Sequence, residues 1–213
     1  MPTTTTLMLF ALASVLLVVV PGPNVIYIVT RGIDQGRQAA VASVLGVQSS
    51  MVFHVGAAAV GLTALLASSE LMFNIVRFAG AGYLVWLGIR NVLTPVSDLE
   101  IGSVPGRPQY RRIFLQGVAV NLLNPKVALF CLALLPQFVD PARGNTAVQI
   151  VILGCVMIAI GLISDTIYAL LSGGIGEWLK TRQRVARQRQ RFSGVVYLCL
   201  GALAALTGSH STK

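Results

Sequence analysis

Two apolar stretches of this chain are interrupted in a similar way. Residues 18–29 read VVVPGPNVIYIV, and residues 117–130 read GVAVNLLNPKVALF. Proline inside a helix removes a backbone hydrogen bond and clashes with the preceding turn. Glycine or asparagine followed by proline is also typical of the start of a helix. Each stretch is therefore predicted to be a helix that stops and starts again.

The composition indicates that these stretches lie in a membrane. The chain has 213 residues and a mean hydropathy of +0.77, and only 11% of its residues are charged. Soluble domains carry about 25% charged residues. The first charged side chain is Arg31, and another uncharged run covers residues 38–69. Because a membrane span needs about 20 apolar residues, both runs are long enough to cross a bilayer.

The first segment is interpreted as a retained span and not as a cleaved signal peptide. No Lys or Arg precedes residue 7, and the apolar run continues past Pro21 to Val29. Both features differ from a signal peptide.

Six predicted spans use nearly all of the chain, which is expected to be an all-α integral membrane protein with one transmembrane domain, 1–213. The spans cover about 6–30, 39–67, 71–90, 113–138, 146–172 and 192–208.

The two halves of the chain share a motif and an order of helices. Arg77-Phe78-x-Gly80-x-x-Tyr83-Leu84 near the third span recurs as Arg191-Phe192-x-Gly194-x-x-Tyr197-Leu198 near the sixth. Each half then contains a broken, a long and a short helix. Because three spans are an odd number, the second half enters the membrane from the opposite side. The pattern predicts two inverted three-helix repeats, about 6–90 and 113–208, with helices 1 and 4 broken near the midplane.

The net charge of +9 is concentrated in three loops. These loops contain Arg31 and Arg37, then Arg90, Arg107, Arg111 and Arg112, and finally Lys180, Arg182, Arg184, Arg187, Arg189 and Arg191. The opposite side has Arg77, Arg143 and Lys213. The positive-inside rule makes the three loops, including about 91–112, cytoplasmic and both termini external. The basic run 180–191 is interpreted as a loop near anionic lipid. The alternative, an RNA-binding arm, is not favoured, and no nucleic-acid partner is expected.

The two breaks are predicted to form the transport site. Irregular backbone at membrane depth is tolerated where it lines a wet cavity or is buried in protein. Gly22 with Pro23, and Asn124 with Pro125, provide an N-cap and a first helical residue. A helix restarted in this way directs free N–H groups and partial positive charge toward a substrate carboxylate. The alternative is two proline kinks with only a packing role.

Two charged side chains fall inside predicted spans. A Lys at the centre of a span costs about 2.5–3.5 kcal/mol or more, so Lys126 should face the interior. It is expected to bind a substrate carboxylate or a protein carboxylate, or to steady a helix end. Asp165 is exposed to opposed influences, because burial favours its neutral form and a nearby Lys126 its charged form. It is therefore a candidate proton carrier, a counter-charge for a substrate ammonium, or a structural partner of Lys126.

Other polar residues are weaker candidates. Gly46, Ser50 and His54 form one helical stripe that permits close helix approach. His54 titrates near neutral pH when unperturbed, although a lone His is more often a packing residue. Tyr168 and Ser172 share a helix face with Asp165. Gln48 and Asn121 are polar without a specific signal. The cysteines, Cys131, Cys155 and Cys199, are interpreted as small apolar residues, and neither a metal site nor a cofactor is predicted.

The ordered motifs resemble those of a known family along essentially the whole chain. They are Pro21-Gly22-Pro23-Asn24; Gly46 and His54 with Gly61-Leu62; Gly80-x-x-Tyr83-Leu84-x-x-Leu87-Gly88; Gly117-x-x-x-Asn121-Leu122-x-Asn124-Pro125-Lys126 with Leu135-Pro136-Gln137-Phe138; and Asp165 with Tyr168. The sequence resembles the lysine-exporter/homoserine-exporter family of bacterial amino-acid efflux proteins. Ser50 is a departure, since many members have Gly there, and substrate choice is not carried over.

The resemblance implies export of amino acids or close relatives, such as threonine, homoserine, leucine or basic amino acids. It also implies coupling to the proton gradient, a bacterial inner-membrane location and a homodimer. We assign substrate binding to Gly22, Pro23, Asn24, Asn121, Asn124, Pro125, Lys126 and Tyr168, and proton coupling to Asp165 and His54.

Three other functions make different demands on the sequence. Divalent-metal efflux requires clustered His, Cys or carboxylate ligands, and only His54, Asp165 and Cys131 are available on separate spans. A membrane-embedded hydrolase would need Ser50 and His54 to act together, but no oxyanion hole is evident. A membrane subunit without transport activity is the third alternative. The chain is therefore expected not to be an enzyme.

Overall fold

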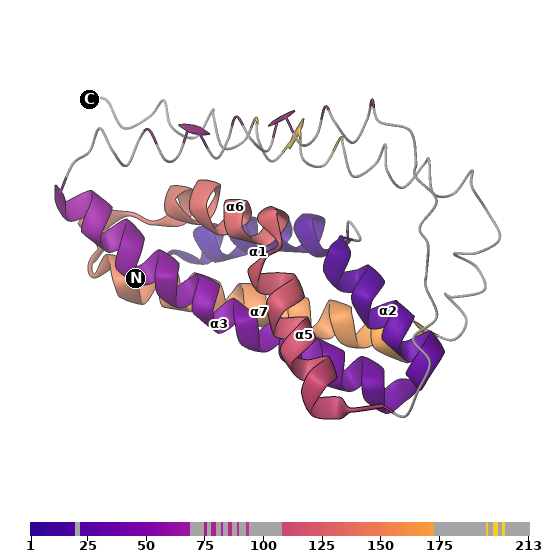
Figure 1. Ribbon diagram of the computed structural model, residues 1–213. Coiled ribbons are helices and arrows are strands. Elements are labelled where there is room, and N and C mark those ends of the chain that lie inside the picture. Colours follow the sequence, from indigo (N-terminus) through magenta and orange to yellow (C-terminus); the bar gives the residue numbers. More distant parts are fainter. Residues whose placement is uncertain are drawn as a thin grey trace.

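The computed structural model describes residues 1–19, 22–68 and 108–172, together with the single residues 75, 78, 79, 82, 85, 86, 89, 93, 195, 198, 199 and 202. The three continuous ranges are helical and contain no strand. Their elements are α1 (Thr4–Val19), α2 (Pro23–Gln35), α3 (Arg37–Ser68), α5 (Tyr110–Leu122), α6 (Pro125–Ala133), the 3₁₀ turns η1 (Leu135–Phe138) and η2 (Pro141–Arg143), and α7 (Thr146–Leu170) (Figure 1).

Both predicted helix restarts are confirmed. Gly22 is the N-cap of α2 with Pro23 in its first turn, and the axes of α1 and α2 differ by 53°. Asn124 is the N-cap of α6 with Pro125 in its first turn, and α5 and the α6–η1 segment differ by 52°. Proline fits the first turn because that N–H has no intrahelical partner. The local chemistry of each motif therefore determines where the second helix starts.

The long helices agree with the predicted spans 39–67 and 146–172, and the helix of the first predicted span, about 6–30, continues beyond the apolar run. Helix α2 continues past residue 30 to Gln35 and ends at Gly36, whose φ is 85°. Glycine adopts this left-handed conformation at no steric cost. Arg31 therefore marks the polar edge of the span and not the end of the helix. The predicted spans 71–90 and 192–208, with the repeated motif, lie outside the described residues apart from single positions.

Hydrogen bonds show which helix ends lie together. Tyr110 Oη donates to Gln38 Oε1 at 2.7 Å, and Arg31 Nη2 donates to Gln116 Oε1 at 2.7 Å. Ser172, just beyond α7, lies against Gly32. These contacts gather the α2–α3 connection, the start of α5 and the end of α7 at one end of the molecule. At the other end the Met1 ammonium donates to the Arg143 carbonyl.

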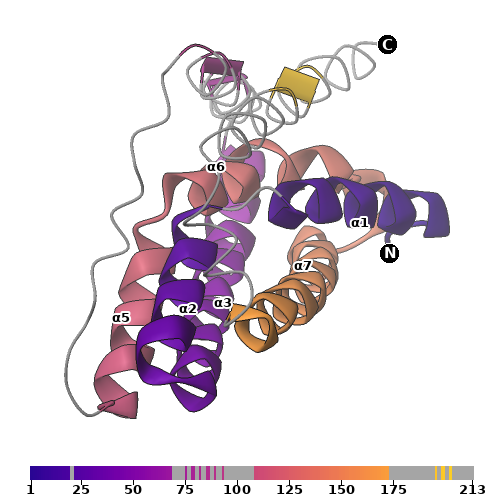
Figure 2. The same cartoon turned by 90° about the vertical axis from the view of Figure 1, so that its right-hand side faces the viewer.

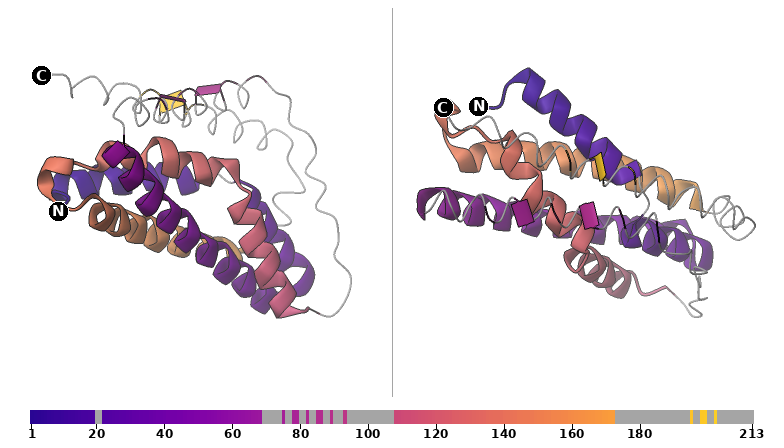
Figure 3. Two further views of the ribbon diagram at one scale, coloured as in Figure 1. Left: turned by 60° about the vertical axis from the view of Figure 1, so that its left-hand side comes forward. Right: turned by 90° about the horizontal axis from the view of Figure 1, so that it is seen from above.

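Helices α3 and α7 therefore run in opposite directions, and Figure 3 shows them lying side by side. Helices α2, α3 and α5 pack together, with α7 beside them and α1 lying against α7 (Figure 2).

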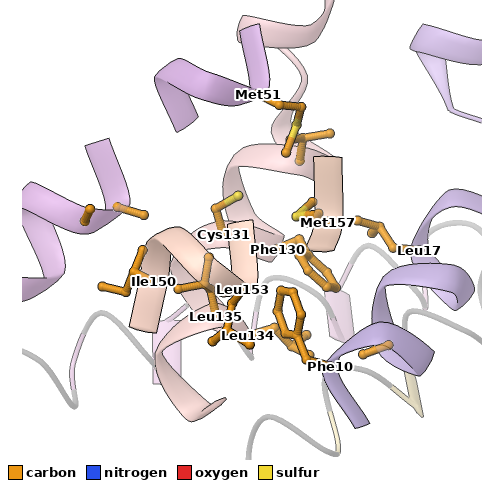
Figure 4. Packing of buried hydrophobic residues seen from close by; sticks show 14 residues of the cluster. Phe10, Leu17, Met51, Phe130, Cys131, Leu134, Leu135, Ile150, Leu153 and Met157 are labelled. Carbon is orange, nitrogen blue, oxygen red and sulfur yellow. The ribbon is translucent and has the colours of Figure 1, made fainter. Parts of the chain in front are cut away.

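Two apolar clusters occupy different levels of the bundle. The larger joins α1, α3, α6, η1 and α7, and in it Phe10 packs against Phe130 with ring centroids 6.0 Å apart (Figure 4). Phe138 also packs against Phe10, with ring centroids 5.2 Å apart. The smaller consists of Ile28, Ala40, Val44, Val47 and Ala169. Along α3, Gln48 and Ser50 lie between the two clusters, and along α7 Asp165 does. A polar layer is thus enclosed between two apolar ones.

The surface is apolar where the helices are longest. Leu45, Val52 and Phe53 on α3 and Ile163 and Ile167 on α7 are exposed. Residues 37–61 of α3 and all of α7 are long and apolar enough to cross a membrane, and the two bent pairs bring the described spans to as many as four. Exposed apolar side chains on such helices are suited to lipid contact. The described helices are those of a multi-pass membrane protein.

Candidate functional site

Three asparagines connect the two helix breaks. Asn24, in the first turn of α2, donates through Nδ2 to Asn121 Oδ1, at the end of α5. Asn124, the N-cap of α6, donates through Nδ2 to Asn24 Oδ1 at 3.0 Å. Asn121 Nδ2 donates to the Val47 carbonyl at 3.0 Å and to Ser50 Oγ. The breaks are therefore hydrogen-bonded to each other and to α3.

The predicted stripe on α3 forms the surface on which α5 packs. A Cβ at Gly46 would collide with the Phe114 carbonyl oxygen, and a Cβ at Gly117 would lie 2.8 Å from the Ser43 carbonyl oxygen. Glycine on both helices is what allows this close approach. One turn beyond Ser50, His54 Nε2 lies 3.2 Å from the Asn121 carbonyl oxygen. The stripe thus holds the end of α5 where the helix breaks.

A cavity of about 50 Å³ lies between the breaks. Six of the residues predicted to form the site line it: Gly22, Asn24, Asn121, Asn124, Lys126 and Asp165. Gln48 and Gly161 add to this lining, and the remaining wall is apolar: Leu17, Val18, Val25, Val47, Met51, Val127 and Met157. The cavity lies where six helices meet: α1, α2, α3, α6, α7 and the end of α5.

On one side of the cavity the Lys126 amine lies beside the start of α2. The Lys126 side chain is only 7% exposed and runs past the start of α2. A Cβ placed on Gly22 would lie 3.4 Å from Lys126 Cδ and 3.8 Å from its Nζ. Gly22 provides no side-chain cap, and a helix N-terminus carries partial positive charge. An ammonium and an uncapped helix start therefore lie together, where an anion is favoured.

The two restarts differ in one respect from the prediction. Both were expected to offer free N–H groups, but the Lys126 N–H of α6 donates to Asn124 Oδ1 at 3.1 Å. The N–H of Val127 donates to the Asn124 carbonyl at 3.2 Å. The start of α6 is thus satisfied by its own cap because Asn124 has a side-chain acceptor. The start of α2 is left without such a cap because Gly22 has no side chain.

The Asp165 side of the cavity combines a carboxylate with an amide. Asp165 is 6% exposed and accepts a hydrogen bond from Gln48 Nε2 at 2.7 Å. It also interacts electrostatically with Lys126. Sequence reasoning assigned no role to Gln48, although a polar amide within an uncharged run was a weak signal. Its partner is 117 positions away, so no local pattern could identify the pair.

Other predicted residues lie beside the cavity lining and not in it. Tyr168 Oη donates to the Val19 carbonyl at 3.5 Å, at the end of α1. Ser172 Oγ donates to the Ala169 carbonyl at 2.9 Å. The face of α7 that lines the cavity continues from Asp165 toward Gly161 and Met157, one and two turns earlier. Pro23 and Pro125 start their helices without lining the cavity.

The structure offers little for the metal and hydrolase alternatives. Within the described part of the chain, no group of three or more His, Cys, Asp or Glu residues could hold a metal ion. His54 reaches the Asn121 carbonyl, and the Ser50 hydroxyl donates to the Val47 carbonyl at 2.8 Å. These contacts are structural hydrogen bonds and do not form a serine–histidine pair.

The comparison with protein families identifies this architecture. The family model described as "LysE type translocator" matches residues 15–208. The chain belongs to the LysE type translocator family. The match confirms the family predicted from the motifs, and it makes this protein a membrane transporter and not an enzyme.

Relatives of this LysE type translocator cover nearly its whole length. It is 35% identical over 196 residues to the homoserine/homoserine lactone efflux protein of Salmonella typhimurium, which spans 92% of this chain and 94% of that protein. It is 28% identical over 196 residues to an uncharacterized membrane protein of Vibrio cholerae, with the same coverage. It is 26% identical over 201 residues to the leucine efflux protein of an Enterobacter strain, covering 94% of both chains. No solved structure matches the chain.

Proposed function

We propose that this LysE type translocator exports amino acids or closely related small metabolites from the cytoplasm in exchange for protons. Two relatives are named for efflux of homoserine, homoserine lactone and leucine. The observation that carries the proposal is the cavity between the two helix breaks. Its lining combines Lys126, beside the uncapped start of α2, with Asp165.

An α-amino acid at neutral pH carries one charge of each sign, and this lining is complementary to it. The substrate carboxylate binds at Lys126 and the start of α2, where Gly22, Pro23 and Asn24 begin the helix. The ammonium faces Asp165. Leu17, Met51 and Met157 provide apolar contact for a side chain. This division of the site accounts for recognition of both charged groups.

The size of the cavity indicates how substrate enters. About 50 Å³ holds only a few water molecules, so a whole amino acid binds only when the breaks move apart. The hydrogen bonds among Asn24, Asn121 and Asn124 cross between the breaks. Opening therefore exchanges these amide contacts for contacts with the substrate. Asn121, Asn124 and Pro125 act in this step by holding and releasing the start of α6.

Proton coupling is assigned to Asp165. An ionised Asp165 attracts the substrate ammonium, and protonation removes that attraction, so proton and substrate occupy the site in turn. His54, which contacts the Asn121 carbonyl at the break, is a second titratable group for this exchange. Tyr168 adjoins the end of α1 through Val19 and is proposed to meet the substrate as the cavity opens there.

The architecture proposed for transport has six spans in two inverted repeats, about 6–90 and 113–208, that rock around the central site. The opposite directions of α1–α2 and α5–α6, and of α3 and α7, support it. One end of the molecule brings together residues 31–38, residues 110–116 and the end of α7. Each of these segments contains or adjoins a predicted basic loop in the sequence, so their common location supports placing all three loops in the cytoplasm. We further propose that both termini lie outside the cell, that the protein resides in the bacterial inner membrane, and that it forms a homodimer.

The test is efflux from proteoliposomes of the full chain loaded with labelled homoserine, threonine, leucine or lysine, with and without an imposed pH gradient. Gradient-dependent release of one or a few of these amino acids is expected. Protein-free liposomes are the control for leakage. Folded protein that releases none of them under either condition contradicts the proposal.

A further inference from the structure

Only one of the two polar atoms of the Gln48 side-chain amide makes a hydrogen bond within the described part of the chain. Its Nε2 donates to Asp165, whereas its Oε1 is buried and has no hydrogen-bond partner among the residues that the structure describes. The residue is 8% exposed and lines the cavity. A buried acceptor without a donor costs about 1–3 kcal/mol. A ligand that enters the cavity and donates a hydrogen bond to Gln48 Oε1 therefore removes this cost, and its binding is stabilised.

The orientation of this amide follows from its neighbours. An ionised carboxylate only accepts hydrogen bonds, so the NH₂ end of Gln48 must face Asp165 and the oxygen must face away. Gly161 on α7 leaves the space that the amide occupies. A Cβ at Gly161 would lie 2.9 Å from Gln48 Nε2 and 3.2 Å from Oε1. The carboxylate and the absence of a side chain at Gly161 together fix where the open acceptor lies.

We infer that Gln48 and Asp165 together form the ammonium-binding subsite, with Gln48 Oε1 accepting a hydrogen bond from the substrate α-ammonium. The inference rests on the proposed function and adds a specificity-determining residue to it. An ammonium has three N–H donors and a positive charge. It can therefore donate to the open oxygen and approach the carboxylate at the same time. A hydroxyl donor would satisfy only the oxygen and would leave the charge of Asp165 without a substrate partner.

The test isolates the ammonium by comparing two ligands. Homoserine and 4-hydroxybutyrate share a carboxylate and a terminal hydroxyl, and only homoserine has the α-ammonium. The half-inhibitory concentration of each is measured against uptake of labelled substrate by proteoliposomes of the full chain. If leucine is the transported amino acid, leucine and 4-methylpentanoate are the matched pair. The ratio of the two concentrations reports the preference for the ammonium.

Gln48→Met removes the acceptor with little change in size. It is expected to reduce the preference for the amino acid about tenfold or more, as loss of about 1.4 kcal/mol implies, while inhibition by the deamino ligand stays the same. Gln48→Asn keeps an amide with both a donor and an acceptor, so it should retain more of the preference than Gln48→Met does. Gly161→Ala leaves Gln48 in place but displaces its amide, so it should lose the preference as Gln48→Met does.

The outcomes separate the inference from the proposed function. If Gln48→Met and Gly161→Ala weaken both ligands equally, Gln48 has only a structural role and the inference is wrong. If neither variant changes the ratio, water satisfies the open oxygen and the inference is wrong as well. A folded wild-type protein that transports no amino acid overturns both proposals. Wild-type transport with an unchanged ratio in the variants overturns this inference alone.

Discussion

Lys126 is a basic side chain in the cavity lining that faces two candidate anions, the protein carboxylate of Asp165 and the proposed substrate carboxylate. It is buried beside Gly22 at the uncapped start of α2, so two positive groups share one side of the cavity. Lys126→Met should therefore weaken binding of ligands with a free carboxylate. Homoserine and its lactone provide the comparison, because both have the ammonium and only homoserine has the carboxylate.

The half-inhibitory concentration of homoserine should rise about tenfold or more in Lys126→Met, from loss of a charged hydrogen bond. That of the lactone should change little. Lys126→Arg keeps the charge and serves as the matched variant. An equal rise for both ligands in Lys126→Met would assign the lysine to protein structure.

Asp165 is expected to separate proton coupling from substrate exchange. Asp165→Asn keeps the size of the side chain and a hydrogen-bonding group near Gln48, but it cannot release a proton. Efflux driven by an imposed pH gradient should be abolished. Exchange of internal for external amino acid should persist but need a higher substrate concentration, because the ammonium loses its counter-charge. Both are measured in the same proteoliposomes. Full gradient-driven efflux by Asp165→Asn would exclude Asp165 as the proton carrier.

At this scale the sequence predicts charged residues better than neutral ones. Lys126 and Asp165 stand out because a charge inside an apolar run is costly and needs a reason. Gln48 is neutral, so its presence in a span costs less and indicates less. Its role depends on Asp165 and Gly161, which lie on another helix. Only the folded structure brings the three together.

Among the helices, the start of α6 offers a direct measure of what a cap contributes. Asn124 accepts from the Lys126 N–H and donates to Asn24. Asn145 caps α7 in the same way, accepting from the Val148 N–H at 3.1 Å, but it lies at the exposed end of the bundle. Replacing either asparagine with alanine should cost about 1 kcal/mol of stability, measured as a lower melting temperature in detergent.

Transport distinguishes the two caps. Asn124→Ala should also reduce efflux, because it releases the contact between the breaks. Asn145→Ala should leave efflux per folded molecule unchanged. Equal efflux from the two variants would mean that the asparagine contact between the breaks has no part in transport.

The glycines of α3 give a second matched pair. A methyl group at Gly46 would collide with the backbone of Phe114, whereas no atom of the described residues lies within 4 Å of a methyl group at Gly56. Gly46→Ala should therefore lower the melting temperature. Gly56→Ala should leave it unchanged or raise it, because alanine favours a helix by about 1 kcal/mol relative to glycine. A similar melting temperature for both variants would mean that α3 and α5 can separate without loss of stability.

Helix starts are predictable because their chemistry is local. Gly22-Pro23 and Asn124-Pro125 specify a cap and a first turn from neighbouring residues alone. Helix α2 continues to Gln35, beyond the apolar run that predicts the first span, because a charged side chain ends an apolar run without ending a helix. The difference between the two starts depends on which hydrogen bonds form, and these cannot be predicted from the neighbouring residues alone.

The orientation of the whole molecule can be tested with single cysteines in a background without the three native ones. Gln35 and Gln109 lie at the end where the α2–α3 connection meets the start of α5, and the exposed Ala142 lies at the end near Met1. Because basic loops stay in the cytoplasm, Gln35→Cys and Gln109→Cys should react with an impermeant maleimide only in inverted vesicles. Ala142→Cys should react in intact spheroplasts. The reverse labelling pattern would place the termini in the cytoplasm.

Most of the described bundle could be predicted in outline. The length of the apolar runs predicted the spans that correspond to α3 and α7. Because each proposed repeat contains three spans, an odd number, helices at the same position in the two repeats were predicted to run in opposite directions, as α3 and α7 do. The sequence could not predict that the polar residues lie between two apolar clusters, the smaller with Ile28, Val47 and Ala169 and the larger with Phe10. This layering depends on which faces meet, and in a membrane both lipid-facing and buried faces are apolar, so helical periodicity carries little information.

The lining of the cavity also has a consequence for stereochemistry. A ligand held at its carboxylate by Lys126 and at its ammonium by Asp165 and Gln48 has its α-carbon fixed between them. The side chain must then point in a direction set by the handedness of that carbon. Mirror-image amino acids would direct it toward different walls, one of which is occupied by Leu17, Met51 and Met157. If the proposed subsites hold the ligand in this way, the site would discriminate between L- and D-isomers while remaining tolerant of side-chain identity.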